Sequence, residues 1–154
     1  MILKLSPDQI GEKWDTIKLS IESSIPPILQ GGEIRMNNIL DALLTDVMQC
    51  WIVENEQGEL CAILTTTFMP DPGTRLISLF VYSIYGIKPL DINMWREVIS
   101  ELRSWARSKG YCNIVAFTNA PKIIQIVKTF GGSANQVLVT IPIVGDENED
   151  IQGN

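Results

Sequence analysis

The chain has 154 residues, of which 45% are apolar, with 12 basic and 18 acidic residues and a net charge of −6. This acidity argues against a nucleic-acid groove or docking on an anionic membrane, so we expect neither partner. No apolar run approaches the ~20 residues that span a bilayer, and the N-terminus lacks a signal-peptide profile. We therefore expect a protein of a reducing, cytoplasmic compartment.

The absence of histidine narrows the chemistry further. It excludes Ser-His-Asp and Cys-His nucleophile systems and removes the commonest zinc ligand, so no metal site is expected. Cys50, Cys61 and Cys112 lie in apolar segments without a C-x-x-C pair, which predicts buried structural thiols. Cys50 and Cys61 are candidates for a bond under oxidising conditions if they face each other across a hairpin.

The N-terminal third predicts two amphipathic helices. Apolar residues recur at helical spacing over 14–25, and Pro26 and Pro27 end this helix. A second apolar stripe covers 39–47. Trp14 is the tryptophan expected at the surface, because its helix lies near a chain end, whereas the other three are expected in the core.

Three strands are predicted in the middle of the chain. The first two flank a turn at Gly58 and indicate a hairpin. The third is apolar on both faces, which favours a central place in the sheet. Their ranges are 49–55, 59–68 and 75–85.

The C-terminal half alternates helices and strands. The most amphipathic helix covers 95–110, and a strand at 111–118, a helix at 120–130 and a last strand at 135–144 follow. The predicted order is α-α-β-β-β-α-β-α-β. It describes an α/β fold with a mixed sheet, in which an antiparallel meander leads into a β-α-β crossover with two parallel strands.

The domain organisation is simple. Residues 1–144 are assigned to a single domain, and 145–154 to an acidic, mobile tail.

This order resembles the GNAT fold of Gcn5-related N-acetyltransferases over most of the chain. The helix predicted over 95–110 supports the resemblance at residue level, because the helix that follows the family's acetyl-CoA loop aligns with it without gaps. The matching positions are Val98, Ile99, Leu102, Ala106 and Gly110. Members of the family usually finish with two strands, and here only 135–144 is clear; the second is absent, supplied by a partner, or located around 130–133.

The family's diphosphate-binding signature falls on the loop "IYGIKPLDINMW". The signature's Arg or Gln, its Gly, and its Gly or Ala are replaced by Leu90, Asn93 and Trp95. In the family, the glycines let backbone N–H groups close around the diphosphate. Trp95 is expected to fill that space, and Asp91 to cap the helix and repel a diphosphate.

The resemblance also implies catalytic groups that this chain lacks. Many members use a glutamate on the third or fourth sheet strand and a tyrosine on the helix after the crossover strand, and the matching segments contain neither. Tyr85 lies nearest the cleft of such a fold; the favoured interpretation is a packing residue with a solvated hydroxyl, and catalysis by Tyr85 is the alternative. GNAT enzymes can also work by proximity alone.

Three functions are compatible with these observations. The preferred hypothesis is a GNAT-like domain that has lost acyl transfer, needs no cofactor, and serves as a binding or assembly module with a protein partner or as a homo-oligomer. In style it resembles short proteins of tailed bacteriophages, some of which are virion-associated. The alternative is an N-acetyltransferase with an atypical loop. A small-molecule sensor is the third. If acetyl-CoA binds, the expected contacts are Ile84, Tyr85, Gly86, Lys88 and Asn93.

Overall fold

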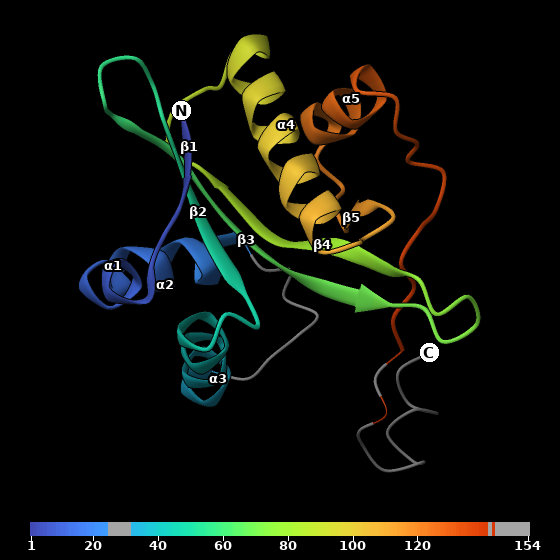
Figure 1. Cartoon of the computed structure of the whole chain (residues 1–154), viewed down its shortest axis with the longest axis horizontal. Helices are drawn as coiled ribbons and strands as arrows, with labels where there is room; N and C mark the ends of the chain where they lie inside the picture. Colours follow the sequence, from blue (N-terminus) through green and yellow to red (C-terminus); the bar gives the residue numbers. More distant parts are fainter. Residues whose placement is uncertain (25–31, 142, 144–154) are drawn as a thin grey trace, which may run out of the picture.

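The computed structural model describes residues 1–24, 32–141 and 143. In these ranges the strands form one five-stranded sheet in the order β1-β2-β3-β4-β5 (Figure 1). The elements are β1 (Ile2–Lys4), α1 (Pro7–Glu12), α2 (Trp14–Ser24), α3 (Gly32–Leu44), β2 (Gln49–Glu54), β3 (Leu60–Pro70), β4 (Ile77–Gly86), α4 (Ile92–Ser108), β5 (Ile114–Ala116) and α5 (Pro121–Thr129).

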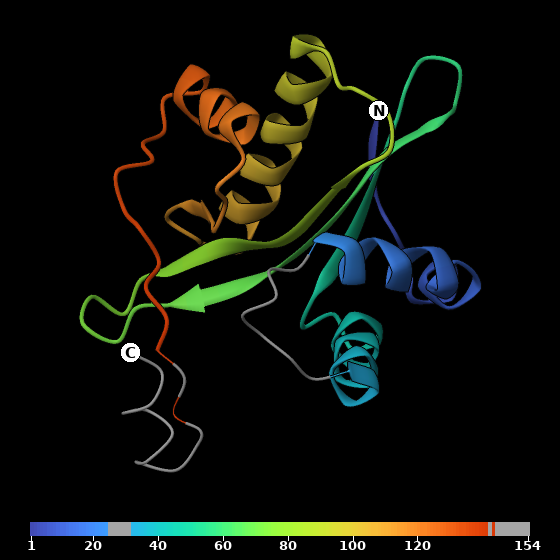
Figure 2. The same cartoon turned by 180° about the vertical axis from the view of Figure 1, so that it is seen from behind.

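The sheet is mixed and is covered by helices on both faces. Strands β1 to β4 pair antiparallel, whereas β4 and β5 are parallel and joined by a crossover through α4. Helices α1 to α3 lie on one face, and α4 and α5 lie on the other (Figure 2). The predicted α/β fold class, with a meander followed by a β-α-β crossover, is therefore confirmed.

Two short N-terminal elements were not predicted. β1 and α1 span three and six residues, which is too short for a periodic pattern to stand out. The start of α1 is nevertheless encoded locally. Ser6 and Gln9 form a reciprocal capping box, and Pro7 occupies the first turn, where its missing N–H costs no helical bond. The predicted helix stop at Pro26 and Pro27 lies outside the described residues.

The prediction of a last strand at 135–144 is wrong for the residues of this segment that the structure describes, because they do not form a strand. Residues 132–141 carry no regular secondary structure, and all of them are exposed. A strand needs a hydrogen-bonded neighbour, and none is present for this segment within the described ranges. The acidic tail, 145–154, falls outside the described residues.

The sheet divides the apolar interior into two layers, and this separates the cysteines. Cys61 packs on the α4 side and Cys50 on the α1–α3 side, where burial raises the pKa of the Cys50 thiol to about 12. Cys50 lies opposite Thr65, so the two thiols do not face each other. Cys112, predicted to be buried, is exposed because it precedes β5 in a loop.

The tryptophans also occupy these two layers. Trp51 and Trp95 are buried, and Trp105 is half-buried with its ring centroid 5.8 Å from that of Trp51. Trp14, expected at the surface, is half-buried against the α1–α3 layer. No helix in the described ranges is both long and apolar enough to cross a membrane.

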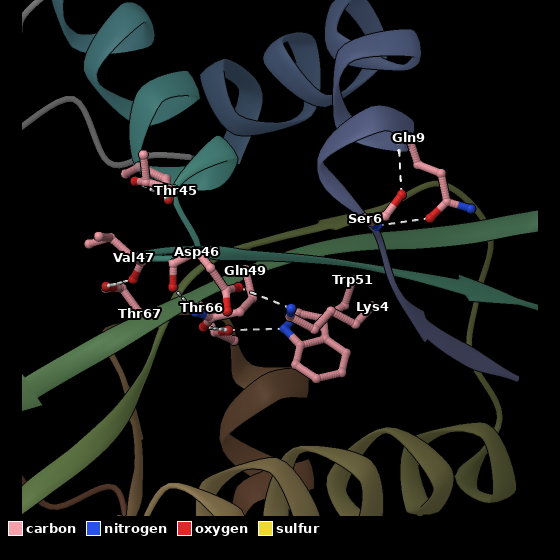
Figure 3. A network of polar contacts seen from close by, with 11 residues as sticks. Lys4, Ser6, Gln9, Thr45, Asp46, Val47, Gln49, Trp51, Thr66 and Thr67 are labelled. Atoms are coloured by element: carbon pink, nitrogen blue, oxygen red, sulfur yellow. Dashed lines mark hydrogen bonds and ion pairs between the residues drawn. The ribbon is translucent and has the colours of Figure 1, made fainter.

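A buried polar chain joins β2 to β3 (Figure 3). The indole N–H of Trp51 donates to the Thr66 hydroxyl at 2.9 Å, and that hydroxyl donates to Gln49 Oε1 at 2.9 Å. Gln49 Nε2 in turn donates to the carbonyl of Asp46 at 2.9 Å. Because each buried group has a partner, the chain fixes the register of the two strands without an unsatisfied polar atom.

We expect Thr66→Val to lower the free energy of unfolding by about 1–3 kcal/mol, because it leaves the Trp51 indole and the Gln49 carbonyl without a partner. Urea unfolding followed by tryptophan fluorescence measures this. Thr67→Val is the matched control: its hydroxyl bonds the Val47 carbonyl near the surface, and its loss is expected to change stability by less than about 0.5 kcal/mol. Equal effects of the two substitutions would contradict the role of the buried chain.

Candidate functional site

An extra residue in β4 opens the sheet beside β5. Thr65 pairs with Ser83 and Thr66 with Val81, so Tyr82 is a bulge that has no residue of β3 opposite it. A bulge bends its strand and increases the local twist. β5 pairs with β4 only along Leu79–Val81. From Tyr82 to Gly86, the β4 edge has no neighbouring strand on the β5 side within the described ranges, and its backbone groups are available to a ligand.

The loop after β4 is anchored at its start. The N–H groups of Ile87 and Lys88 both donate to the carbonyl of Cys61 on β3, at 2.8 and 3.1 Å. Leu90 is buried in the core on the α4 side. These contacts bring the loop directly from the free β4 edge to the first turn of α4.

Asp91 caps α4, as predicted. Its carboxylate accepts from the N–H of Met94 at 2.9 Å. In the described part of the chain, the N–H groups of Ile92 and Asn93 have no protein acceptor. Two backbone donors therefore remain at the positive end of the helix dipole, beside one fixed negative charge.

Trp95 does not fill the space of a diphosphate, contrary to expectation. Its side chain is 8% exposed and belongs to the core between α4 and the sheet. The helical period places it on the same face as Val98 and Leu102, and burial of this face directs the indole inward. The indole N–H is buried without a partner in the described residues.

Lys88 is ion-paired rather than directed at the helix end. Its ammonium lies 2.7 Å from Glu59 Oε1. The hydrogen bond from Lys88, followed by that from Asn55, lowers the pKa of the Glu59 carboxyl below its ordinary value. The loop's single cation is thus largely offset by a neighbouring acid.

The other residues expected to contact acetyl-CoA lie along the free edge and the first turn of α4. Ile84 packs toward α4, whereas Tyr85 is half-buried opposite Ile63, on the other face of the sheet. Gly86 is exposed at the end of β4. Asn93 is exposed, and its side-chain oxygen accepts from Arg96 Nη1 at 2.7 Å.

A cationic groove along α4 was missed in the sequence. It has a volume of about 330 Å³, and Phe130 is among its lining residues. Its arginines recur at helical spacing on one face of α4, and this spacing could have been recognised in the sequence. No carboxylate is among the described lining residues. Arg103 Nη2 donates to the Phe130 carbonyl at 2.9 Å. The lining residues are Arg96, Ile99, Ser100, Arg103, Ser104, Arg107 and Phe130.

The site offers no metal-binding cluster. No three His, Cys, Asp or Glu side chains gather within the described ranges in a way that could hold a metal ion. The groups that the site offers for binding and catalysis are backbone N–H donors, guanidinium groups and the Tyr85 hydroxyl.

Comparison with known proteins gives matches in structure but not in sequence. No family model matches the chain, and no curated protein matches it. Among solved structures, it is similar to a ribosomal-protein-alanine N-acetyltransferase from Brucella melitensis biovar Abortus 2308, with a TM-score of 0.63, 14% identity, and coverage of 93% of this chain and 99% of that chain.

Two further structures have the same architecture. A predicted acetyltransferase with acetyl-CoA from Clostridium acetobutylicum gives a TM-score of 0.68 at 12% identity, covering 93% of this chain and 96% of that chain. Glucosamine-6-phosphate N-acetyltransferase from Arabidopsis thaliana gives 0.64 at 11% identity, covering 94% and 98%. At sequence identities of 11–14%, these similarities show a shared fold. The chain therefore has the fold of the GNAT N-acetyltransferases, as the sequence predicted.

Proposed function

We propose that the protein is an acyl-CoA-dependent N-acyltransferase that binds acetyl-CoA at the free edge of β4. The observation that carries the proposal is the path along the backbone from the β4 edge at Tyr82–Gly86 to the N–H groups of Ile92 and Asn93, all of which lack a protein partner on that side within the described residues. The N-acyltransferase hypothesis replaces the non-catalytic module as the preferred one, because the Trp95 side chain lies in the core and does not occupy the space beside the loop.

The residues fit the ligand in part. The pantetheine arm carries peptide-like amides, which pair with a free strand edge as an added strand does. The N–H groups of Ile92 and Asn93 suit a diphosphate oxygen, because a helix N-terminus favours anions. Arg96 extends this positive region into the groove along α4. Asp91 opposes the diphosphate, so we expect weaker binding than a glycine-rich loop would give.

The proposed chemistry is acyl transfer by positioning. Acetyl-CoA supplies the activated thioester. Backbone N–H groups on the β4 edge polarise its carbonyl, and the edge holds it for attack by a neutral amine, so that a C–N bond forms as the C–S bond breaks and the amine nitrogen releases a proton to water. Neither β4 nor β5 contains a carboxylate that would act as a base. We assign Tyr85 as the proton donor to the leaving thiolate, because it lies at the end of the free edge.

Thermal unfolding with and without millimolar acetyl-CoA tests the proposal directly. Ligand at about 100 times its Kd stabilises the native state by about 2.7 kcal/mol, which raises the Tm by several degrees in a domain of this size. Release of free coenzyme A in the presence of a panel of primary amines, measured by chromatography, tests the transfer step. No shift in Tm would overturn the proposal and restore the non-catalytic module.

Two substitutions at the helix start should act in opposite directions. Ile92→Pro removes one N–H at a position where proline suits a helix, as Pro7 does in α1, and Asp91 already has the extended backbone that precedes proline. We expect the affinity for acetyl-CoA to fall roughly ten- to hundredfold. Asp91→Asn keeps the cap but removes the charge, so we expect higher affinity, with a gain that shrinks as salt is added.

Isothermal titration calorimetry measures both affinities. The unfolding midpoint of each variant without ligand is the control, because it must stay near that of the unmodified protein. Unchanged affinity in Ile92→Pro would exclude the start of α4 from the site.

The ion pair between Lys88 and Glu59 gives a separate prediction. Lys88→Met removes the largest cause of the lowered Glu59 pKa, so this pKa should rise toward its ordinary value. Because the folded pKa is depressed, the pair's contribution to stability is present above the ordinary pKa and is lost as the pH falls through the folded value. NMR titration of the side-chain carboxyls measures this. The Asp71 pKa, which Thr74 lowers, should not move. We also expect Lys88→Met to weaken acetyl-CoA binding less than Ile92→Pro does.

A further inference from the structure

Three aromatic side chains contact one another where β4 and β5 part. The ring centroids of Phe80 and Phe117 lie 5.4 Å apart, with an angle of 68° between the ring planes. The centroid of Phe80 also lies 6.0 Å from that of Tyr82, at 81°. Tyr82 packs against the α1–α3 layer, whereas neither phenylalanine belongs to a core cluster of the described residues. We name Phe80, Tyr82 and Phe117 the aromatic cluster.

The bulge in β4 places this cluster on the same sheet face as the proposed proton donor. Leu79 and Val81 belong to the core under α4, so Phe80, between them, faces the α1–α3 side. In a regular strand Tyr85 would face the opposite side, because it is an odd number of residues from Phe80. The extra residue shifts the alternation by one, and Tyr85 lies opposite Ile63 on the α1–α3 side. The Tyr85 side chain and the aromatic cluster therefore share one face.

The cluster also borders the proposed acetyl-CoA site. The last pair between the two strands joins Val81 of β4 to Ala116 of β5. The next residue on each strand, Tyr82 or Phe117, carries a ring of the cluster. Helix α4 covers the other face of the sheet (Figure 2). An amine that attacks a thioester on the free β4 edge is therefore expected to approach from the α1–α3 face, beside the cluster.

Arg35 of α3 fixes the inner end of the cluster. Its Nε and Nη2 groups donate to the Tyr82 hydroxyl at 3.2 and 2.6 Å. Hydrogen bonds from a charged donor are stronger than neutral ones, so the Tyr82 ring is held firmly. At the other end, Phe117 is 53% exposed. A fixed ring next to an exposed one leaves aromatic surface on which a third ring can pack edge to face.

The charges beside the cluster narrow the class of amine. The two segments that border the opening, 77–86 and 111–120, contain no charged residue. A polycationic amine is attracted by carboxylates, and these segments provide none. The charge that reaches the cluster, the Arg35 guanidinium, is positive and repels such an amine. An amine with a single nitrogen on an apolar body suits these surroundings better.

We propose that the acceptor substrate is a primary amine that carries an aromatic ring, an arylalkylamine, and that its ring packs against Phe80 and Phe117. This inference rests on the proposed acyl transfer and adds the class of acceptor to it. The amine nitrogen attacks the thioester carbonyl, so that the C–N bond forms and the C–S bond breaks. The nitrogen releases a proton to water, and Tyr85 protonates the leaving thiolate. The products are an N-acetylated arylalkylamine and free coenzyme A.

Steady-state rates with matched amines test the acceptor class. We expect kcat/KM for 2-phenylethylamine to exceed that for butylamine roughly tenfold or more, and spermidine to react more slowly than 2-phenylethylamine. Phe117→Ala should raise the KM for 2-phenylethylamine roughly three- to tenfold and leave the KM for acetyl-CoA unchanged. The control is Phe68→Ala. Phe68 is also exposed, at 45%, but it pairs with Leu79 and faces the α4 side, so neither KM should change.

Binding of an unreactive analogue gives a readout that does not depend on turnover. 2-Phenylethanol has the same ring and lacks the amine. In the presence of coenzyme A, saturation-transfer NMR should show contact of its ring with the unmodified protein and with Phe68→Ala, and weaker contact with Phe117→Ala. If acetyl-CoA raises the Tm but the ring shows no contact, or 2-phenylethylamine and butylamine react equally, this inference is overturned and the acyl transfer stands. If acetyl-CoA does not raise the Tm, the proposed function fails, and the acceptor class fails with it.

Discussion

The candidate site depends on one extra residue in β4. The bulge at Tyr82 shifts the register between β3 and β4, and the parallel pairing with β5 ends just before it, at Val81. Without the bulge, β4 would continue as a regular strand, and more of its outer edge would be available to β5. With it, the backbone from Tyr82 to Gly86 has no strand beside it on the β5 side within the described residues, and it leads into the first turn of α4. A change of one residue in register thus separates a closed sheet from an open one.

The electrostatics of the site combine opposing elements. The helix dipole, the two N–H groups that have no acceptor among the described residues, and three arginines along α4 attract an anion, whereas Asp91 lies at the same helix end and repels it. Lys88 contributes little, because Glu59 holds it. The positive groove is local, since the chain as a whole is acidic.

The sheet is also incomplete at its last strand. β5 is three residues long and has one neighbour in the described ranges, as β1 does at the other end of the sheet, so the candidate site borders a short edge strand.

The sequence alone determined the fold class, because the periodicity of α4 and the apolar runs of β2 to β4 are long and regular. It also determined the cap at Asp91, since an acid just before an amphipathic helix has one favourable role. Only the tertiary structure decided where Trp95 points, because its orientation depends on which helix face the sheet covers. It alone showed that Cys50 and Cys61 lie on opposite faces, since register fixes the face of each strand residue. The sequence 135–144 has the propensity of a strand, and the described fold offers it no ladder, because pairing is a property of neighbours and not of the segment itself.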